Sequence, residues 1–122
     1  MGASSATVNL PNPLLNWTNE SAGATVTRAQ GVQVTWTGGA SGTYVFISGS
    51  STSGGVIGSF TCFAPQSALQ FTVPAYVTET LPAGSGTLMV ENTTQYTTFP
   101  ATGLDLGVAF GFTGASTNST YQ

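Results

Sequence analysis

The sequence predicts an all-β fold, and more specifically an immunoglobulin-like antiparallel β-sandwich of about seven to nine strands. Three observations support this expectation. Short segments of alternating, aromatic or β-branched residues recur along the 122 residues, and Gly, Pro and Ser separate them. No long stretch has the 3.6-residue periodicity of a helix. Trp36 lies in a clearly alternating segment and is the kind of core residue that such sandwiches use.

The expected elements follow one another at short intervals. We expect strands at residues 7–10 (a short one), 14–18, 24–28, 32–37, 43–47, 56–63, 69–73, 88–92 and 104–112. Pro74, Glu79 and Pro82 favour a helical turn within residues 74–82. The segments 32–37 and 43–47 are expected to pair as a β-hairpin around a Gly-rich turn. Residues 48–55 are expected to form a flexible loop of Ser, Thr and Gly.

The segment 104–112 has the strongest alternation in the chain. Its five large apolar residues share one parity, and Asp, Gly and Ala occupy the other. It is therefore expected to be a core strand whose small residues allow another backbone to approach closely. The residues expected in the core are Val32, Val34, Trp36, Phe71, Val90, Leu106 and Phe110.

The chain divides into an N-terminal arm or linker remnant, residues 1–13, and a sandwich domain, residues 14–122. The arm is small, polar and interrupted by Pro11 and Pro13. The first residues have neither the basic nor the apolar region of a signal peptide. We therefore expect the chain to be an excerpt of a longer secreted protein.

Charged residues are unusually scarce. One Arg and four acidic residues make up 4% of the chain, and Lys and His are absent. A single cation excludes electrostatic binding of nucleic acid and a polybasic contact with a membrane. No apolar run is long enough to cross a membrane, so we expect no membrane insertion. The 34 Ser and Thr residues favour an extracellular or cell-surface location.

The residue types of most catalytic and metal sites are missing. Without His or Lys the usual activated Ser and Cys nucleophiles cannot be built, and Cys62 is expected to be a small buried apolar residue. Glu20, Glu79, Glu91 and Asp105 are expected to be solvated, although two carboxylates at the right separation would suffice for glycoside hydrolysis. Calcium would have only Asp105 or Glu91 with backbone carbonyls. We therefore expect no enzymatic activity, no cofactor and no metal.

Aromatic residues leave glycan binding open. Trp17, Tyr44, Tyr76 and Tyr96 would offer a stacking platform if their rings were exposed. Tyr76 and Tyr96 are the two expected to contact a glycan. The alternative is that these aromatic residues lie in or near the core.

The missing Lys residues also concern the edges of the predicted sheets. Edge strands are usually protected by charged residues, and here they lack that protection. The edges are therefore expected either to be covered by loops or to pair with another copy, which would give a homo-oligomer. The expected inter-subunit strand is Thr7, Val8, Asn9 and Leu10, with residues 113–122 as the other terminal segment able to serve.

Several motifs in the right order resemble a known family. These are LNWTNESAGATVTRAQGVQVTWTGG, YVFISGSS, FTCFAPQSALQFTVP, LPAGSGTLMVEN, ATGLDLG and the closing TYQ. Over residues 14–122 they are similar to an immunoglobulin-like C-terminal domain of large secreted acidobacterial proteins, a family of unknown function. The resemblance implies an exported β-sandwich and assigns no activity and no functional residue.

The function that these observations favour is a non-enzymatic extracellular structural or adhesive module. The alternative is a self-assembling subunit of an extracellular filament that adds an N- or C-terminal arm to a neighbouring sheet. A carbohydrate-binding module is the third expectation.

Overall fold

The computed structural model describes residues 4–122, which form an all-β fold of several sheets. The strands are β1 (Asn16–Trp17), β2 (Thr25–Val26), β3 (Val32–Thr37), β4 (Tyr44–Ser53), β5 (Val56–Pro65), β6 (Gln70–Val73), β7 (Gly84–Thr93), β8 (Thr97–Phe99), β9 (Gly107–Ala109) and β10 (Phe112–Tyr121). The helices are the 3-10 turns η1 (Glu20–Ala24), η2 (Arg28–Gln30) and η3 (Gln66–Ala68), and the short α1 (Ala75–Thr78). The helical turn expected within residues 74–82 is confirmed by α1.

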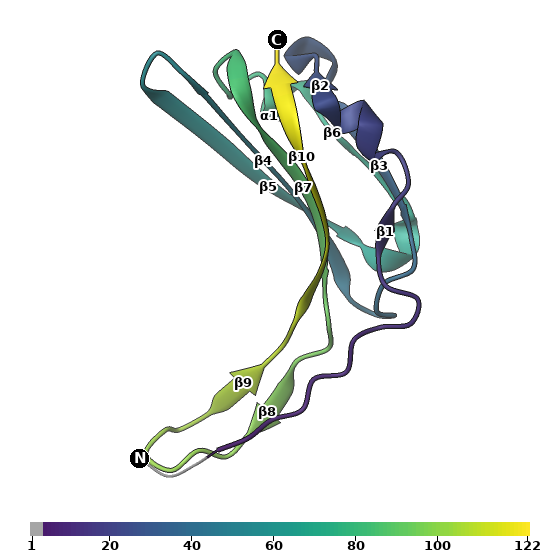
Figure 1. The fold of residues 1–122 in the computed structure, drawn as a ribbon, viewed down its shortest axis with the longest axis vertical. Coiled ribbons are helices and arrows are strands. Elements are labelled where there is room, and N and C mark those ends of the chain that lie inside the picture. Colours follow the sequence, from purple (N-terminus) through teal and green to yellow (C-terminus); the bar gives the residue numbers. More distant parts are fainter. Residues whose placement is uncertain (1–3) are drawn as a thin grey trace.

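Two sheets face each other across the core. One has three strands in the order β1-β3-β6, and the other has five in the order β2-β10-β7-β4-β5. All neighbouring strands are antiparallel except β2 and β10, which are parallel. The five-stranded sheet is strongly curved, and β8 and β9 form a separate hairpin beyond its end (Figure 1).

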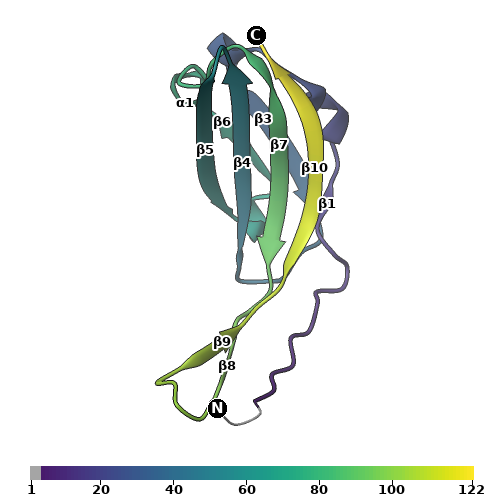
Figure 2. The same ribbon diagram turned by 60° about the vertical axis from the view of Figure 1, so that its left-hand side comes forward.

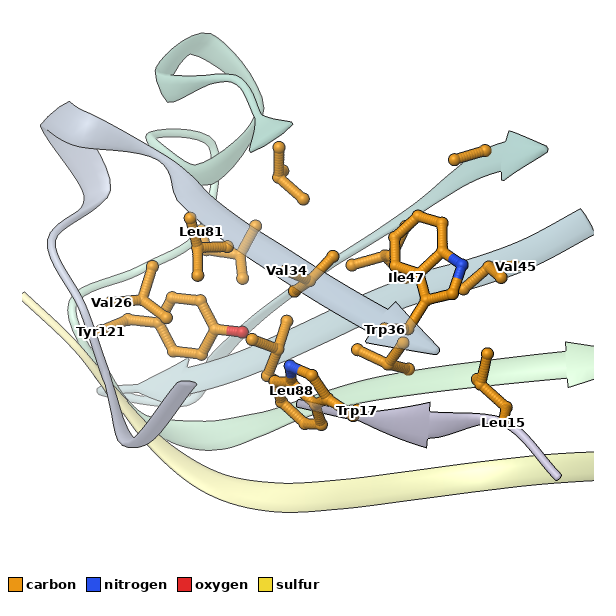
Figure 3. Close-up of a cluster of buried hydrophobic side chains, with 14 residues drawn as sticks. Leu15, Trp17, Val26, Val34, Trp36, Val45, Ile47, Leu81, Leu88 and Tyr121 are labelled. Atoms are coloured by element: carbon orange, nitrogen blue, oxygen red, sulfur yellow. The ribbon is translucent and has the colours of Figure 1, made fainter. Parts of the chain in front are cut away.

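The core lies between the two sheets. Trp36 is 1% exposed, and its indole N–H donates to the Gln66 carbonyl at 2.8 Å. Figure 3 shows Trp17, Trp36 and Tyr121 pointing into one cluster with the aliphatic residues of β3, β4 and β7. Val32, Val34, Trp36 and Val90 are buried as expected, and Phe71 is partly buried against the cluster.

The expected hairpin between residues 32–37 and 43–47 is wrong. β3 pairs with β1 and β6, whereas β4 pairs with β5 and β7 in the other sheet. The intervening connection crosses between the sheets and is held by Asn92 of β7, which is fully buried. Its side-chain oxygen accepts from the Ala40 N–H at 2.8 Å, and its amide donates to the Tyr44 carbonyl at 2.8 Å. Adjacent strands in the sequence therefore belong to different layers.

The prediction of a loop at residues 48–55 is also wrong, except at its last two residues. β4 continues to Ser53, and only Gly54 and Gly55 form the turn to β5. Both glycines have positive φ, at 56° and 82°, which a two-residue hairpin turn of this twist requires. The Ser-rich sequence is thus a strand, and Ser51 donates its hydroxyl to the Pro82 carbonyl at 2.6 Å.

The predicted core strand 104–112 is the third correction. It is divided between β9 and the start of β10, and Leu106 and Phe110 are 63% and 51% exposed. The physical reason is that this segment extends beyond the region where the second sheet covers the first (Figure 2).

The two terminal segments differ from each other in whether they belong to a sheet. Residues 113–122 belong to β10 of the chain's own sheet, whereas residues 7–10, where a short strand was expected, form no strand.

No helix within the described part of the chain is both long and apolar enough to cross a membrane.

Candidate functional site

The β8–β9 hairpin projects from the sandwich. β7 and β10 leave the five-stranded sheet together and continue into β8 and β9, which pair from Thr97↔Ala109 to Phe99↔Gly107 (Figures 1 and 2). The Phe99 ring lies over Gly107, where an added Cβ would stand 2.6 Å from a ring carbon. Glycine at this position therefore lets the hairpin close.

The alternation of residues 104–112 places its large side chains outside the core. Leu104, Leu106, Val108, Phe110 and Phe112 are all about half exposed or more. Within the described part of the chain, neither the three-stranded sheet nor a helix buries them. The parity predicted from the sequence is therefore present, but the apolar side faces outward.

Four phenylalanines join this segment to the outer face of the five-stranded sheet. The ring centroids of Phe110 and Phe112 are 5.3 Å apart, those of Phe112 and Phe46 are 6.0 Å apart, and those of Phe46 and Phe63 are 4.8 Å apart. The outer two pairs meet edge to face, the geometry that aromatic rings prefer. Beside them lies a shallow apolar pocket of about 380 Å³, which Tyr96 and Val108 help to line. We call Phe46, Phe63, Tyr96, Val108, Phe110 and Phe112 the apolar strip.

The N-terminal arm lies on the opposite, small-residue side of the same segment. An added Cβ on Gly111 would stand 3.6 Å from Leu10 and 3.8 Å from Val8, so this glycine is close to the arm. The neighbours of this glycine are thus side chains, two of them from the chain's own arm, rather than the closely approaching backbone that the small residues led us to expect. Leu10 nevertheless remains 58% exposed, and Thr7 and Asn9 are also exposed.

The two tyrosines expected to bind a glycan are both exposed but lie far apart. Tyr76 is 74% exposed on α1, near the C-terminal end of the sandwich, and Tyr96 is 72% exposed at the base of the hairpin (Figure 1). They therefore form no common platform. Of the other two aromatic residues, Trp17 is buried and Tyr44 is exposed.

A polar groove lies between the arm and the connection from β3 to β4. Its volume is about 470 Å³, and Asn9, Asn12, Ser41 and Gln95 contribute polar side chains to its lining. The Gln95 amide donates to the Ser41 carbonyl at 3.0 Å. None of the described residues that line this groove is titratable.

The four acidic residues considered for catalysis or metal binding lie on separate elements. Glu20 begins η1, Glu79 follows α1, Glu91 is on β7, and Asp105 lies in the loop between β8 and β9. Residues 4–122 contain no group of three or more His, Cys, Asp or Glu that would hold a metal ion. Cys62 is half-buried on β5, and burial raises the pKa of its thiol.

β5 forms an outer edge of the five-stranded sheet. It pairs with β4 along its whole length, and no hydrogen bond joins its other edge to the rest of the described chain. The apolar strip and this edge are the two surfaces that distinguish the molecule. The alternation of residues 104–112 was the available signal for the strip, but a period of two does not say which face is covered.

Comparison of the chain with models of protein families, with curated proteins and with solved structures finds no match, so the functional conclusion depends on these surfaces.

Proposed function

We propose that this chain is a non-enzymatic structural or adhesive module of the extracellular space or cell surface, which makes its contacts through the apolar strip. The observation that carries the proposal is the row of four phenylalanine rings outside the core. Contiguous exposed apolar patches on soluble domains mark interaction sites, and aromatic residues dominate the energetics of such sites.

The partner that fits the strip is a second copy of the chain. The six residues of the strip carry no charge, and the formal net charge of the whole chain is only −3. Two copies therefore repel each other weakly. In a contact with twofold symmetry, the same patch meets itself, so one uncharged aromatic surface suffices for both sides. Burial of the strip would also support the projecting hairpin, since two-stranded sheets are marginally stable in water.

We further propose an immunoglobulin-like topology for the sandwich. The strand order supports it. Strands β1, β3 and β6 occupy the places of A, B and E in one sheet, and β5, β4, β7 and β10 those of C′, C, F and G in the other. The family resemblance of residues 14–122 agrees with this topology and supports the extracellular location.

The native mass of strip variants tests the proposed contact. We expect the wild-type chain to exceed its 12.3 kDa monomer mass in light scattering as its concentration rises. The double variant Phe110→Ser, Phe112→Ser should associate less than the wild type at every concentration. Tyr76→Ser is the control, because it removes an exposed aromatic ring at the other end of the molecule. Equal association of the strip variant and the wild type would contradict the proposal.

The filament subunit is the second candidate, and the open edge of β5 together with the exposed arm favours it. Carbohydrate binding stays a prediction, with Tyr96 beside the apolar pocket as its remaining point of support.

A further inference from the structure

We propose that the open edge of β5 accepts residues 4–10 of a second copy as an added strand. This inference specifies the contact that a filament subunit, the second candidate function, would make. It shares with the proposed function only the premise that the chain self-associates, because it depends on a different surface and on different residues.

The free backbone groups of β5 follow from its register. Pro65 stands opposite Tyr44 and has no N–H, and the N–H of Gln66 donates to the Thr43 carbonyl at 2.9 Å. The pair Tyr44↔Pro65 is therefore one that exchanges no hydrogen bonds, and every second pair along the ladder shares this property. The residues of these pairs on β5 direct their N–H and C=O groups away from β4. They are Ile57, Ser59, Thr61 and Phe63.

This edge lacks the features that keep sheet edges from pairing. β5 is ten residues long, and the whole sequence from residue 29 to residue 78 contains no charged residue. Pro65, the proline in β5, is at the very end of the strand. Ile57 and Phe63 are 74% and 59% exposed on its outer side. A long, uncharged and apolar edge of this kind is a template for another strand.

The inner side of β5 is incompletely covered. The side chains that alternate with the exposed ones, Phe60 and Cys62, point toward the core and pack against it, yet both remain only partly buried. The facing sheet has three strands against five, and its strand β6 is only four residues long. An additional strand beside β5 would cover Phe60 and Cys62 with its own inward side chains.

The arm has the pattern that this position requires. Ala6, Val8 and Leu10 share one parity, and Thr7 and Asn9 share the other. As a strand, the arm would therefore place its apolar residues over Phe60 and Cys62. Its polar residues would lie on the outer side beside Ser59 and Thr61. Residues 4–10 form no strand in their own chain, and none of their backbone groups is hydrogen-bonded to another residue of the described range 4–122.

The direction of the arm favours a second copy. Figure 2 shows the arm descending from β1 on the side of the sandwich that carries β10, whereas β5 forms the opposite edge. The arm runs along the projecting hairpin, away from its own β5, and is thus presented to a neighbour. Donor and acceptor are different surfaces of the chain, so the contact is head-to-tail and can continue from copy to copy.

Disulfide trapping at Cys62 tests the inference through side-chain parity. We expect single cysteines placed at Ala6, Val8 or Leu10 to yield, on mild oxidation, disulfide-linked multimers that reducing agent dissolves. Cysteines at Thr7 or Asn9 are the matched controls and should yield few, because their side chains face the other side of the sheet. Introducing Cys62→Ser into the Val8→Cys chain should abolish the Cys62-linked ladder of multimers, since only cysteines on the arm then remain. Equal trapping at both parities, or none at either, would overturn the proposal.

A second comparison separates the edge from the apolar strip. Thr61→Lys places a charge on the free edge, and Met89→Lys places the same charge two strands away on the same face. We expect loss of trapping at Val8→Cys with Thr61→Lys and full trapping with Met89→Lys. In the Phe110→Ser, Phe112→Ser background trapping should persist. If it disappears there while Thr61→Lys has no effect, the strip carries the association and the edge does not.

Discussion

At the scale of single residues, Asn92 holds the connection that runs between the two sheets. It is fully buried on β7, and its amide also donates to the Thr43 hydroxyl at 2.7 Å. Together with its bonds to the Ala40 N–H and the Tyr44 carbonyl, these contacts use both ends of the side chain. The connection that carries the chain from one sheet to the other is therefore fixed by a residue about fifty positions away.

Removal of this side chain should be costly. Asn92→Ala leaves the Ala40 N–H and the Tyr44 carbonyl without their buried partner, which costs about 2–3 kcal/mol of unfolding free energy. Urea denaturation of the variant and the wild type measures the difference. Asn118→Ala, at an exposed position of β10, is the control and should change the unfolding free energy by less than about 0.5 kcal/mol. A similar small change for both variants would contradict the role given to Asn92.

Ionisation of Tyr121 is expected to lower the free energy of unfolding at alkaline pH. It is 1% exposed, its hydroxyl donates to the Thr87 carbonyl at 2.8 Å, and burial raises its pKa from 10.0 to about 12. In the unfolded chain the phenol ionises near pH 10, so the folded state holds the proton more tightly. The resulting stabilisation is complete below pH 10 and is lost between pH 10 and 12, by roughly 2 kcal/mol.

Thermal denaturation from pH 8 to 12 measures this effect. The Tyr121→Phe variant removes the titrating group while keeping the ring, so its melting temperature should fall less across the same range. An equal decline in the two proteins would show that Tyr121 does not cause the alkaline loss.

At the scale of elements, the segment 104–112 shows how far the sequence predicts the fold. Its alternation correctly gives the parity of its residues, because side chains of any strand alternate between two faces. It does not give the face that is covered, since that depends on where the second sheet ends. Leu106 and Phe110 are therefore outside the core, whereas Val34 and Trp36, in the middle of β3, were predictable as core residues.

Pairing between strands was the least predictable feature. The segments 32–37 and 43–47 have the composition of a hairpin. They instead pair with strands distant in the sequence, and the buried Asn92 holds the connection between them. The two-residue turn at Gly54 and Gly55 was detectable, since two adjacent glycines flanked by strand residues favour it. For the candidate site, the sequence left open whether Tyr96 is exposed, and the strand expected at residues 7–10 is absent from the chain's own sheets. The contact among the four phenylalanine rings joins residues distant in the sequence, so no local pattern predicts it.

The division into core and surface predicts unequal losses of stability within the five-stranded sheet and its extension. Ile47→Ala removes a fully buried side chain of β4 and should cost about 2–5 kcal/mol. Phe110→Ala removes a larger side chain that is half exposed, and should cost far less in a dilute sample of monomer. Chemical denaturation compares them. A larger loss of unfolding free energy for Phe110→Ala than for Ile47→Ala would contradict the placement of the segment 104–112 outside the core.

At the scale of the whole molecule, the apolar surfaces lie where the protecting charges are missing. The apolar strip extends along the outer face toward the projecting hairpin, and the free edge of β5 runs along the side of the sandwich away from β10. A chain with five charged residues has little electrostatic repulsion to keep copies apart. The low charge, the exposed aromatic rings and the unpaired edge therefore all favour a protein that functions through contacts with further copies of itself.

The native mass of the wild-type chain, measured by light scattering over a series of concentrations, tests self-association most directly. We expect the mass to rise above 12.3 kDa as the concentration increases, and to rise less in variants of the strip or of the edge. A mass of 12.3 kDa at every concentration would contradict both proposed contacts, and would leave a module that acts as a monomer.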